Sequence, residues 1–342
     1  VDRARMRGEA LPPFAGVPIA VKDNICTEGV RTTCASRMLE HFVPPYSATV
    51  WEKLSGGGSI LLGKVNMDEF AMGSSTEHSA LGVTRNPRDP RRVAGGSSGG
   101  SAAAVCARSA PWAIGTDAGG SIRQPASFCG VVGMRPTYGT VSRRGLISFA
   151  PSFDQIGPLT RCVRDNALLL GLIAGHDPLD AQSVCMQTPD YTSMLGADLH
   201  GLRVGILQVP DALHADPDVS AAAEGALTRL AALGAQTDAA VLAGLQYALS
   251  AYHIIADAEA SSNLARFDGI RFGHRTEDGS DPRTVYARSR SEGFGTEVKR
   301  RILIGAYLLQ AGEGKSVYET AQRARRRIRA EYEALFRRFD LI

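Results

Sequence analysis

The stretch that decides the fold is residues 95–123, which read Gly-Gly-Ser-Ser-Gly-Gly-Ser-Ala-Ala-Ala-Val-Cys-Ala-Arg-Ser-Ala-Pro-Trp-Ala-Ile-Gly-Thr-Asp-Ala-Gly-Gly-Ser-Ile-Arg. Its middle predicts an alanine-rich helix over Ser101–Arg108 and then a strand over Trp112–Thr116. Glycine-rich turns precede the helix and follow the strand, and glycine permits tight turns and close backbone approach to a ligand. In the second turn Gly119 and Gly120 stand directly before Ser121, where consecutive backbone N–H groups can converge on one point. The stretch therefore predicts an oxyanion hole beside a serine hydroxyl.

Short apolar strands alternate with helices along the rest of the chain. Strands are expected over Val17–Val21, Ser59–Leu62 and Leu202–Leu207. Helices are expected over Ser47–Ser55, with Ser47 as N-cap and Gly56–Gly58 as the stop, over Asp165–Ala174, and from Pro217 to Gly234 behind an Asp216 N-cap. This alternation predicts an α/β fold with a mixed, mainly parallel sheet flanked by helices. We see no internal repeat, and we expect a single domain over residues 1–342.

Composition excludes several classes of protein. The 342 residues are 44% hydrophobic and 21% charged, a balance that excludes wholesale disorder. The net charge of +3, from 38 basic and 35 acidic residues, is too even for a histone-like protein. The charge-free window 239–256 is short for a membrane span and predicts a buried helix. The six cysteines show no CxxC spacing, so we expect no metal site and a reduced, cytoplasmic setting.

Two motif matches are decoys. Residues 58–64 nearly fit the phosphate-binding GxxxxGK pattern, but Val65 has no hydroxyl for magnesium and the middle of the match reads as a strand. Residues 95–99 fit the G-x-S-x-G elbow of the α/β-hydrolases, which requires a preceding strand and histidine and aspartate partners. Residues 91–94 read as a loop instead, and no histidine stands in a distinctive context.

A lysine offers the missing base. Within residues 16–24, an apolar strand ends on Lys22. Burial disfavours the ammonium form and lowers the pKa of a lysine toward neutrality. A neutral lysine that acts through a second serine would activate a serine nucleophile without histidine.

These three elements in this order resemble the amidase-signature family, and the resemblance extends from Gly16 to Gly175. The spacing fits the family's Ser–cis-Ser–Lys triad, with 75 residues from Lys22 to Ser97 and 24 from Ser97 to Ser121. The resemblance implies that Ser121 is the nucleophile, that Ser97 is the bridging serine behind a cis peptide, and that Lys22 is the base. It also implies that Ala118, Gly119 and Gly120 form the oxyanion turn, whereas Ser98 lies one residue off the spacing.

Within that family, four further motifs are similar to the glutamine-hydrolysing A subunits of tRNA-dependent amidotransferases. These motifs are residues 66–77, 154–158, 259–264 and 292–302. The similarity implies that glutamine is the ammonia donor for misacylated Glu-tRNA(Gln) or Asp-tRNA(Asn). An arginine of the Arg300-Arg301 pair, with Arg301 preferred, would hold its α-carboxylate, and Tyr252 would be a further contact.

The resemblance also implies partners. Ammonia would pass to a B subunit, which uses ATP and magnesium and binds most of the tRNA, and a small C subunit would wrap around this chain. This chain would need no cofactor of its own and no membrane. The opening on Val1 and the close on residues 339–342, which read as entry into a strand, lead us to expect an incomplete domain. An N-terminal helical part and C-terminal core segments would be missing.

Two alternative functions stay open at this point. A free-standing amidase of the same family would share the triad but lack glutamine specificity. A non-catalytic fragment that binds RNA or a protein partner would rest on the helix pattern over Arg323–Arg338, which carries seven arginines. A solvated helix face is the more common origin of such a charge run.

Overall fold

The computed structural model describes residues 2–12, 14–209, 215–310 and 312–342. They form two compact units. The first comprises Val1–Ser193 and Glu259–Gly305, and the second comprises Met194–Ala258 and Ala306–Ile342. The expectation of one amidase-signature domain over the whole chain stays a prediction.

The first unit is built on a five-stranded sheet with the order β2-β1-β5-β7-β6. Its strands are β1 (Pro18–Lys22), β2 (Ile60–Val65), β5 (Trp112–Asp117), β6 (Val132–Gly133) and β7 (Gln155–Thr160). The pairs β1–β2 and β1–β5 are parallel, whereas β7 pairs antiparallel with both β5 and β6. Only β7 therefore runs against the other strands, and the predicted mixed, mainly parallel sheet is confirmed.

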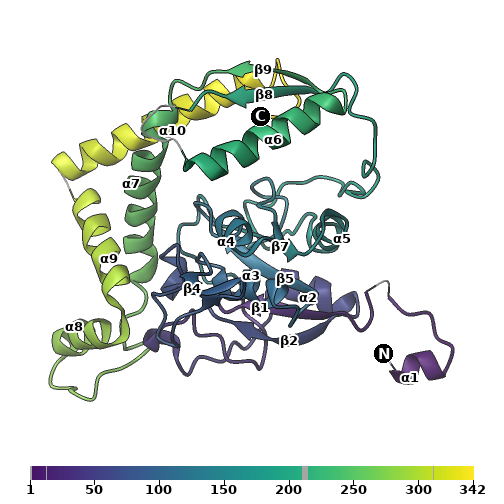
Figure 1. The fold of residues 1–342 in the computed structure, drawn as a ribbon. Helices are drawn as coiled ribbons and strands as arrows, with labels where there is room; N and C mark the ends of the chain where they lie inside the picture. Colours follow the sequence, from purple (N-terminus) through teal and green to yellow (C-terminus); the bar gives the residue numbers. More distant parts are fainter. Residues whose placement is uncertain (1, 13, 210–214, 311) are drawn as a thin grey trace. The chain divides into compact units, whose positions relative to one another are not determined.

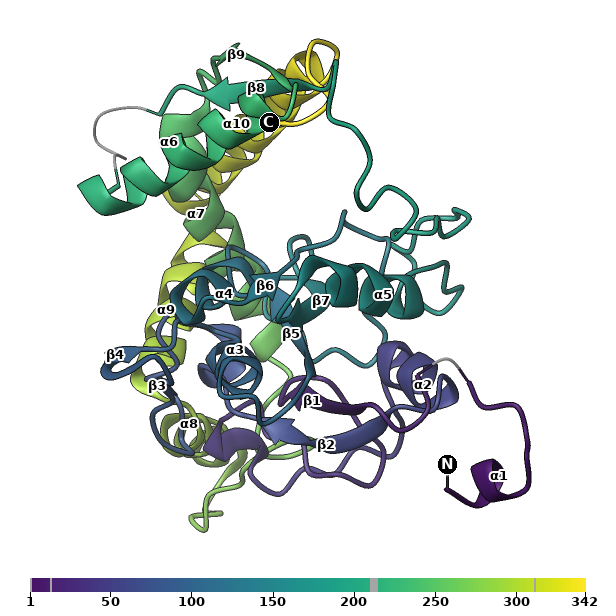
Figure 2. The same ribbon diagram turned by 45° about the vertical axis from the view of Figure 1, so that its right-hand side comes forward.

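Helices cover both faces of this sheet, as Figure 2 shows. One face packs Ile19, Val21 and Ile114 against α2 (Thr49–Gly56) and α5 (Val163–Ile173). The other face packs Ala20 and Ala113 against α3 (Gly99–Cys106) and α4 (Arg123–Cys129). Side chains alternate between the faces of a strand, so Lys22 has the same parity as Ala20 and belongs to the α3 face.

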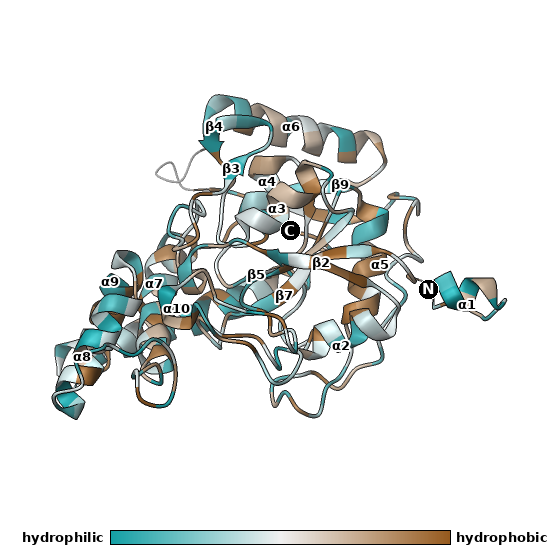
Figure 3. Cartoon of the chain, turned by 90° about the horizontal axis from the view of Figure 1, so that it is seen from below, coloured by the Kyte–Doolittle hydropathy of each residue, from teal (hydrophilic) through white to brown (hydrophobic). Residues whose placement is uncertain are grey.

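Shorter elements complete the first unit. They are α1 (Asp2–Met6), the 3₁₀ turns η1 (Arg37–Leu39) and η2 (Glu69–Ala71), the hairpin strands β3 (Arg85–Asn86) and β4 (Asp89–Val93), α8 (Pro282–Gly293) and most of α9 (Thr296–Leu308). Figure 3 shows that α8 and β4 are largely hydrophilic, whereas α5 is more hydrophobic.

Two local expectations are wrong. Residues 91–94 are expected to be a loop, but residues 89–93 form β4, because they pair with Arg85–Asn86 rather than with the central sheet. Ser47 is not the N-cap of α2, because its hydroxyl accepts the Glu28 N–H at 3.0 Å and Ala48 takes the cap position.

The second unit contains a parallel pair of strands, β8 (Arg203–Leu207) and β9 (Gln236–Ala240), joined through α6 (Pro217–Ala232) (Figure 1). Pro217 begins α6 as predicted, and Asp216 takes the N-cap position, although its side chain makes no capping hydrogen bond. Most of α7 (Leu245–Leu264) and α10 (Glu313–Leu335) also belong here, and their core contains Leu242, Leu335 and Phe339. Residues 239–240 end β9, so the charge-free window is a strand end followed by a helix. Among the described residues, no helix has both the length and the apolar character that a membrane crossing needs.

Candidate active site

Lys22 is fully buried at the end of β1. Its Nζ lies 2.7 Å from Ser97 Oγ, 2.8 Å from Ser98 Oγ and 2.8 Å from Thr116 Oγ1. The two serines come from the loop before α3, and Thr116 lies on β5 next to β1. Because β1, β5 and the start of α3 meet here, three hydroxyl oxygens surround one amine.

The loop that carries Ser97 and Ser98, here called the serine loop, is held in place by residues of the 66–77 motif. The Gly96–Ser97 peptide bond is cis. Thr76 bridges the loop, since its hydroxyl donates to the Gly95 carbonyl at 2.8 Å and accepts the Gly99 N–H at 3.1 Å. A Cβ on Gly96 would lie 2.1 Å from Asp68 Oδ2, so only glycine allows this approach. The 66–77 motif therefore has a structural role, which is to hold the serines against Lys22.

Asp117 organises the turn that carries Ser121. Its carboxylate accepts the Gly120 N–H at 2.8 Å and the Ile122 N–H at 3.1 Å, and the Arg123 guanidinium donates two further bonds to it. Burial raises the pKa of Asp117, but these hydrogen bonds outweigh burial and hold it below its ordinary value. The Gly120 N–H is therefore occupied, and Gly120 adopts a φ of +122°.

Gly120→Ala is expected to lower activity and stability, because L side chains rarely adopt this φ, although the nearest atom to an added Cβ is 3.9 Å away. Such strain costs about 1–3 kcal/mol. Thermal melting and the rate of amide hydrolysis would measure it. Gly63→Ala is the matched control, because its added Cβ meets no atom within 4 Å. An unchanged melting temperature in Gly120→Ala would contradict the assignment of strain.

A backbone hydrogen bond joins Ser121 to the loop that carries Ser97 and Ser98. In it, the Ser98 N–H donates to the Ser121 carbonyl at 3.1 Å. The Ser121 side chain is half-buried, unlike those of Ser97 and Ser98, which are fully buried. Within the described residues, no direct hydrogen bond joins the Ser97 and Ser121 hydroxyls. The structure thus joins Lys22 directly to Ser97 and brings Ser121 alongside through its main chain.

Burial dominates the electrostatics of the site. Desolvation lowers the pKa of Lys22 to about 7, against the opposing effect of the carboxylates of Asp68, Asp117 and Asp154. Burial also raises the pKa of Asp154 to about 6, although this carboxylate accepts the Ser148 hydroxyl and two backbone N–H groups. A lysine with this pKa is partly neutral near pH 7 and can accept a proton.

The two arginines of the predicted pair differ in burial. Arg301 is 8% exposed, and its guanidinium lies 5.6 Å from the centre of the Phe149 ring. Arg300 is exposed and donates two hydrogen bonds to Glu297 at 2.7 and 2.8 Å. Arg301 donates to the same carboxylate at 2.7 Å, and hydrogen bonds from Arg300 first and Arg301 next lower the pKa of Glu297 to about 2. Burial thus favours Arg301 as a binding group inside the first unit.

The other motif residues fix the loop before β7. Glu259 accepts the Ser152 N–H at 2.9 Å, and Asn263 donates to the Ser148 carbonyl. Tyr252 lies earlier on α7, in the second unit, where its ring contacts His253 edge-on at 5.2 Å. Its role as a substrate contact stays a prediction.

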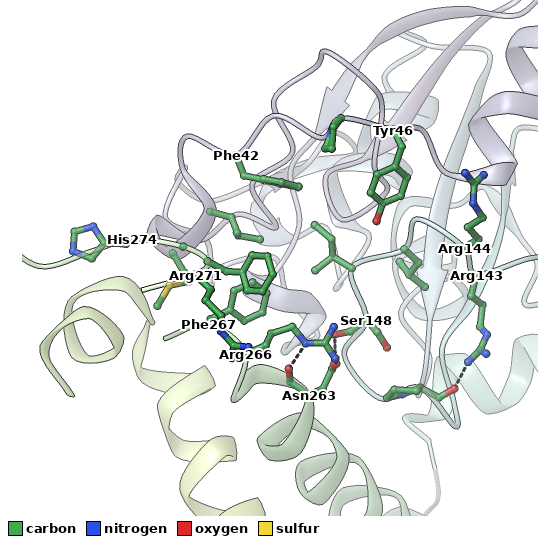
Figure 4. A pocket seen from close by; sticks show the side chains of 18 of the residues that line it. Phe42, Tyr46, Arg143, Arg144, Ser148, Asn263, Arg266, Phe267, Arg271 and His274 are labelled. Atoms are coloured by element: carbon green, nitrogen blue, oxygen red, sulfur yellow. Dashed lines mark hydrogen bonds between the residues drawn. The ribbon is translucent and has the colours of Figure 1, made fainter. Parts of the chain in front are cut away.

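A cavity of about 1120 Å³ opens elsewhere in the first unit (Figure 4). It is lined by segments 37–46, 143–151, 179–181 and 263–275. None of Lys22, Ser97 and Ser121 lines it, but Ser148 does, and its hydroxyl also binds Asp154. Several of its arginines are already engaged, such as Arg143 with Asp180 at 2.9 Å and Arg266 with Asn263. The cavity therefore does not contain the candidate catalytic residues, and Ser148 is the lining residue that bonds Asp154.

Sequence reasoning misses three contributors to the site. The spacing excludes Ser98 from the triad, yet Ser98 Oγ lies 2.8 Å from Lys22 Nζ, almost as close as Ser97 Oγ at 2.7 Å. Thr116 and Asp117 have no role of their own in the sequence-based prediction. An aspartate three residues before a glycine is typical of a side chain that caps backbone N–H groups, so the sequence does carry a signal for the role of Asp117.

In the described ranges no group of three or more histidine, cysteine, aspartate or glutamate side chains is arranged to hold a metal ion.

A mixed sheet with a lysine buried at the end of one strand, in contact with buried serines of the loop before a helix, is the architecture of amide-cleaving enzymes of the amidase-signature class. The chain belongs to the Amidase family, whose family model matches residues 1–342. The A subunit of the glutamyl-tRNA(Gln) amidotransferase of Thermosynechococcus vestitus is 55% identical over all of this chain and 71% of its own length. The resemblance inferred from the sequence is thereby confirmed.

Solved structures agree with this assignment. The crystal structure of the corresponding A subunit of the glutamyl-tRNA(Gln) amidotransferase from Thermotoga maritima is 44% identical, with a TM-score of 0.81. The match covers 97% of this chain and 68% of that one. The native peptide amidase from Stenotrophomonas maltophilia is 32% identical with a TM-score of 0.79, and the match covers 96% of this chain and 68% of that one.

Proposed function

We propose that this chain is the glutamine-hydrolysing subunit of a tRNA-dependent amidotransferase, with Lys22, Ser97 and Ser121 as its catalytic triad. The observation that carries the chemistry is the 2.7 Å contact between Lys22 Nζ and Ser97 Oγ in a buried site. The name of the 55% identical relative supports the choice of glutamine over other amides.

In the proposed reaction, neutral Lys22 accepts the Ser97 proton while Ser97 accepts the Ser121 proton. Ser121 Oγ attacks the side-chain amide carbon of glutamine. The oxyanion that forms is held by backbone N–H groups of the 118–121 turn. Gly120 donates its own N–H to Asp117, so we assign the oxyanion to the N–H groups of Ala118, Gly119 and Ser121. Gly120 then contributes the positive φ that shapes the turn, whereas its N–H does not bind the oxyanion.

Proton return from the triad to the amide nitrogen releases ammonia and leaves a γ-glutamyl ester on Ser121. Water, activated by the same serine and lysine, hydrolyses that ester to glutamate and regenerates the Ser121 hydroxyl. The reaction needs no redox step and no metal in this chain. We propose that the ammonia passes to a B subunit, which would bind ATP, magnesium and most of the tRNA in the cytoplasm, and that a C subunit completes the complex.

Arg301→Lys is expected to reduce kcat/KM for glutamine by roughly 10- to 150-fold, the equivalent of a lost charge-assisted hydrogen bond of about 1.5–3 kcal/mol. Lysine keeps the charge, but it loses the planar fork that binds a carboxylate with two donors. Steady-state glutaminase assays measure the effect. Arg300→Lys is the matched control, since Arg300 is exposed on the same helix and pairs with Glu297. A large loss in Arg300→Lys with no loss in Arg301→Lys would transfer the role to Arg300.

The deciding experiment for the function is glutaminase activity of the full-length gene product with and without its partner subunits. Ammonia release from glutamine that rises when the partners are added supports the proposal. Hydrolysis of aromatic or aliphatic amides in preference to glutamine would instead favour a free-standing amidase, the interpretation that the likeness to the peptide amidase keeps open.

The RNA-binding alternative has less support. On α10, Arg327 pairs with Glu331 at 3.0 Å and Arg329 pairs with Glu333 at 2.8 Å, one helical turn apart in each case. Such pairs are typical of a solvated helix face. Salt-sensitive tRNA binding by this chain alone that survives loss of Ser121 would support a role for α10.

A further inference from the structure

Asn24 stands two residues after Lys22 and is only 2% exposed. Its Nδ2 donates a hydrogen bond to Thr116 Oγ1 at 3.1 Å. Its Oδ1 is buried with no hydrogen-bond partner among the described residues. A buried amide oxygen without a partner is unfavourable for stability, so packing alone does not account for an asparagine here.

The number of N–H donors on a neutral Lys22 amine points to a role for the Asn24 side-chain amide. Three hydroxyl oxygens lie within 2.8 Å of Nζ, but a neutral amine has only two N–H donors and one free electron pair. If Lys22 is to take a proton from Ser97, that electron pair must face Ser97. Both N–H groups must then be accepted by Ser98 and Thr116.

Ser98 satisfies this requirement through the backbone. Its hydroxyl proton is donated to the Thr116 carbonyl at 3.0 Å, and its oxygen also accepts the Thr116 N–H at 3.2 Å. Ser98 is therefore left as an acceptor toward Lys22. Among the described residues, the Thr116 hydroxyl makes no hydrogen bond to the backbone. Apart from Lys22, its hydrogen-bond partner there is the Asn24 side chain.

We propose that Asn24 is a positioning residue that holds Thr116 Oγ1 as an acceptor for Lys22 and so keeps the free electron pair of Lys22 directed at Ser97. The amide N–H occupies one lone pair of the Thr116 oxygen and a Lys22 N–H occupies the other, so the Thr116 proton points away from the amine. Without Asn24, the Thr116 hydroxyl rotates and donates its proton to the amine, in competition with Ser97. This proposal rests on the proposed role of Lys22 as base.

A double-mutant cycle tests whether Asn24 acts through Thr116. Asn24→Leu keeps the number of side-chain heavy atoms and removes the donor, and Thr116→Val keeps the shape and removes the hydroxyl. We expect each single variant of the full chain, assembled with its partners, to lower kcat on glutamine about 10-fold with little change in KM. A 10-fold change in rate corresponds to the free energy of about one hydrogen bond. The double variant should lose no more than the single variants, because both remove the same interaction.

Thr116→Ser restores a hydroxyl and should retain more of kcat than Thr116→Val. Asn166→Leu is the matched control for packing, because Asn166 is buried in α5 and also donates to a threonine hydroxyl, that of Thr160 at 3.2 Å. This control should lower the melting temperature and leave kcat unchanged. If Asn24→Leu does not fold, Asn24→Ser, which is too short to reach Thr116, replaces it in the cycle.

Losses that multiply to about 100-fold in the double variant, or an unchanged kcat in a folded Asn24 variant, overturn the proposal. The same cycle is run on the ester p-nitrophenyl acetate, whose cleavage needs the nucleophile and its base but not glutamine recognition. Activity on the ester without activity on glutamine refutes the glutamine assignment and still tests Asn24. An active Lys22→Met variant refutes the base, and the positioning proposal falls with it.

Discussion

Ser121→Ala is expected to lower glutamine hydrolysis by at least about 10³-fold, because the variant loses the atom that attacks the amide carbon. Removal of a nucleophile leaves only the contribution of binding and of the oxyanion hole. The fold should persist, since the side chain is half-buried and the turn is held by Asp117 through backbone N–H groups. Ammonia release and thermal melting, measured on the same preparation, separate chemistry from stability.

Ser127→Ala provides the control for this variant, since Ser127 is an exposed serine on α4, the helix that follows Ser121. Its activity should match the wild type. Mass spectrometry of the protein treated with a reactive glutamine analogue should find the adduct on Ser121. An adduct on Ser97 or Ser98 would move the nucleophile to the other serine loop.

The sequence is sufficient where the chemistry depends on one strand or one turn. The apolar run before Lys22 predicts a strand and a buried lysine with a lowered pKa, and the structure agrees with both. The helix at Pro217 begins as predicted because its Asp-Pro signal is local. The family can also be inferred, because its motifs are short runs of contiguous residues.

The sequence is insufficient where the outcome depends on which segments meet in space. Ser98 contacts Lys22 because the loop before α3 faces the end of β1, and no spacing rule contains that geometry. Ser47 is expected to cap α2, but a tertiary partner, the Glu28 N–H, competes for its hydroxyl. The direction of β7 is another such case, since only pairing with β5 reveals that it is antiparallel. Hydrogen-bond partners far apart in the chain are properties of the folded state.

Lys22→Met is expected to abolish activity and to leave the protein folded. Methionine fills a similar volume but cannot accept a proton, so Ser97 loses its base.

Desolvation lowers the pKa of the folded-state lysine to about 7, whereas an unfolded chain keeps the ordinary value of 10.5. Between these values the unfolded state binds one more proton, so the free energy of unfolding of the wild type should rise with pH relative to Lys22→Met. Below about pH 7 both states are protonated and the difference should be constant. Denaturant titrations of the two proteins from about pH 6 to about pH 10 measure this difference.

The pH dependence of the wild-type rate carries the same signature. Only the neutral amine acts as base, so kcat/KM should rise about 10-fold per pH unit below pH 7 and level off above it. A histidine base, with an ordinary pKa near about 6.5, would give a similar limb, so the limb alone does not identify the group. Replacement of each of the seven histidines in turn does, since every such variant should keep its rate while Lys22→Met loses it. If Lys22→Met keeps most of the wild-type rate and one histidine replacement removes it, the base is that histidine. Ser97 then belongs to the nucleophile-elbow interpretation, because G-x-S-x-G surrounds it and a histidine would complete the pair.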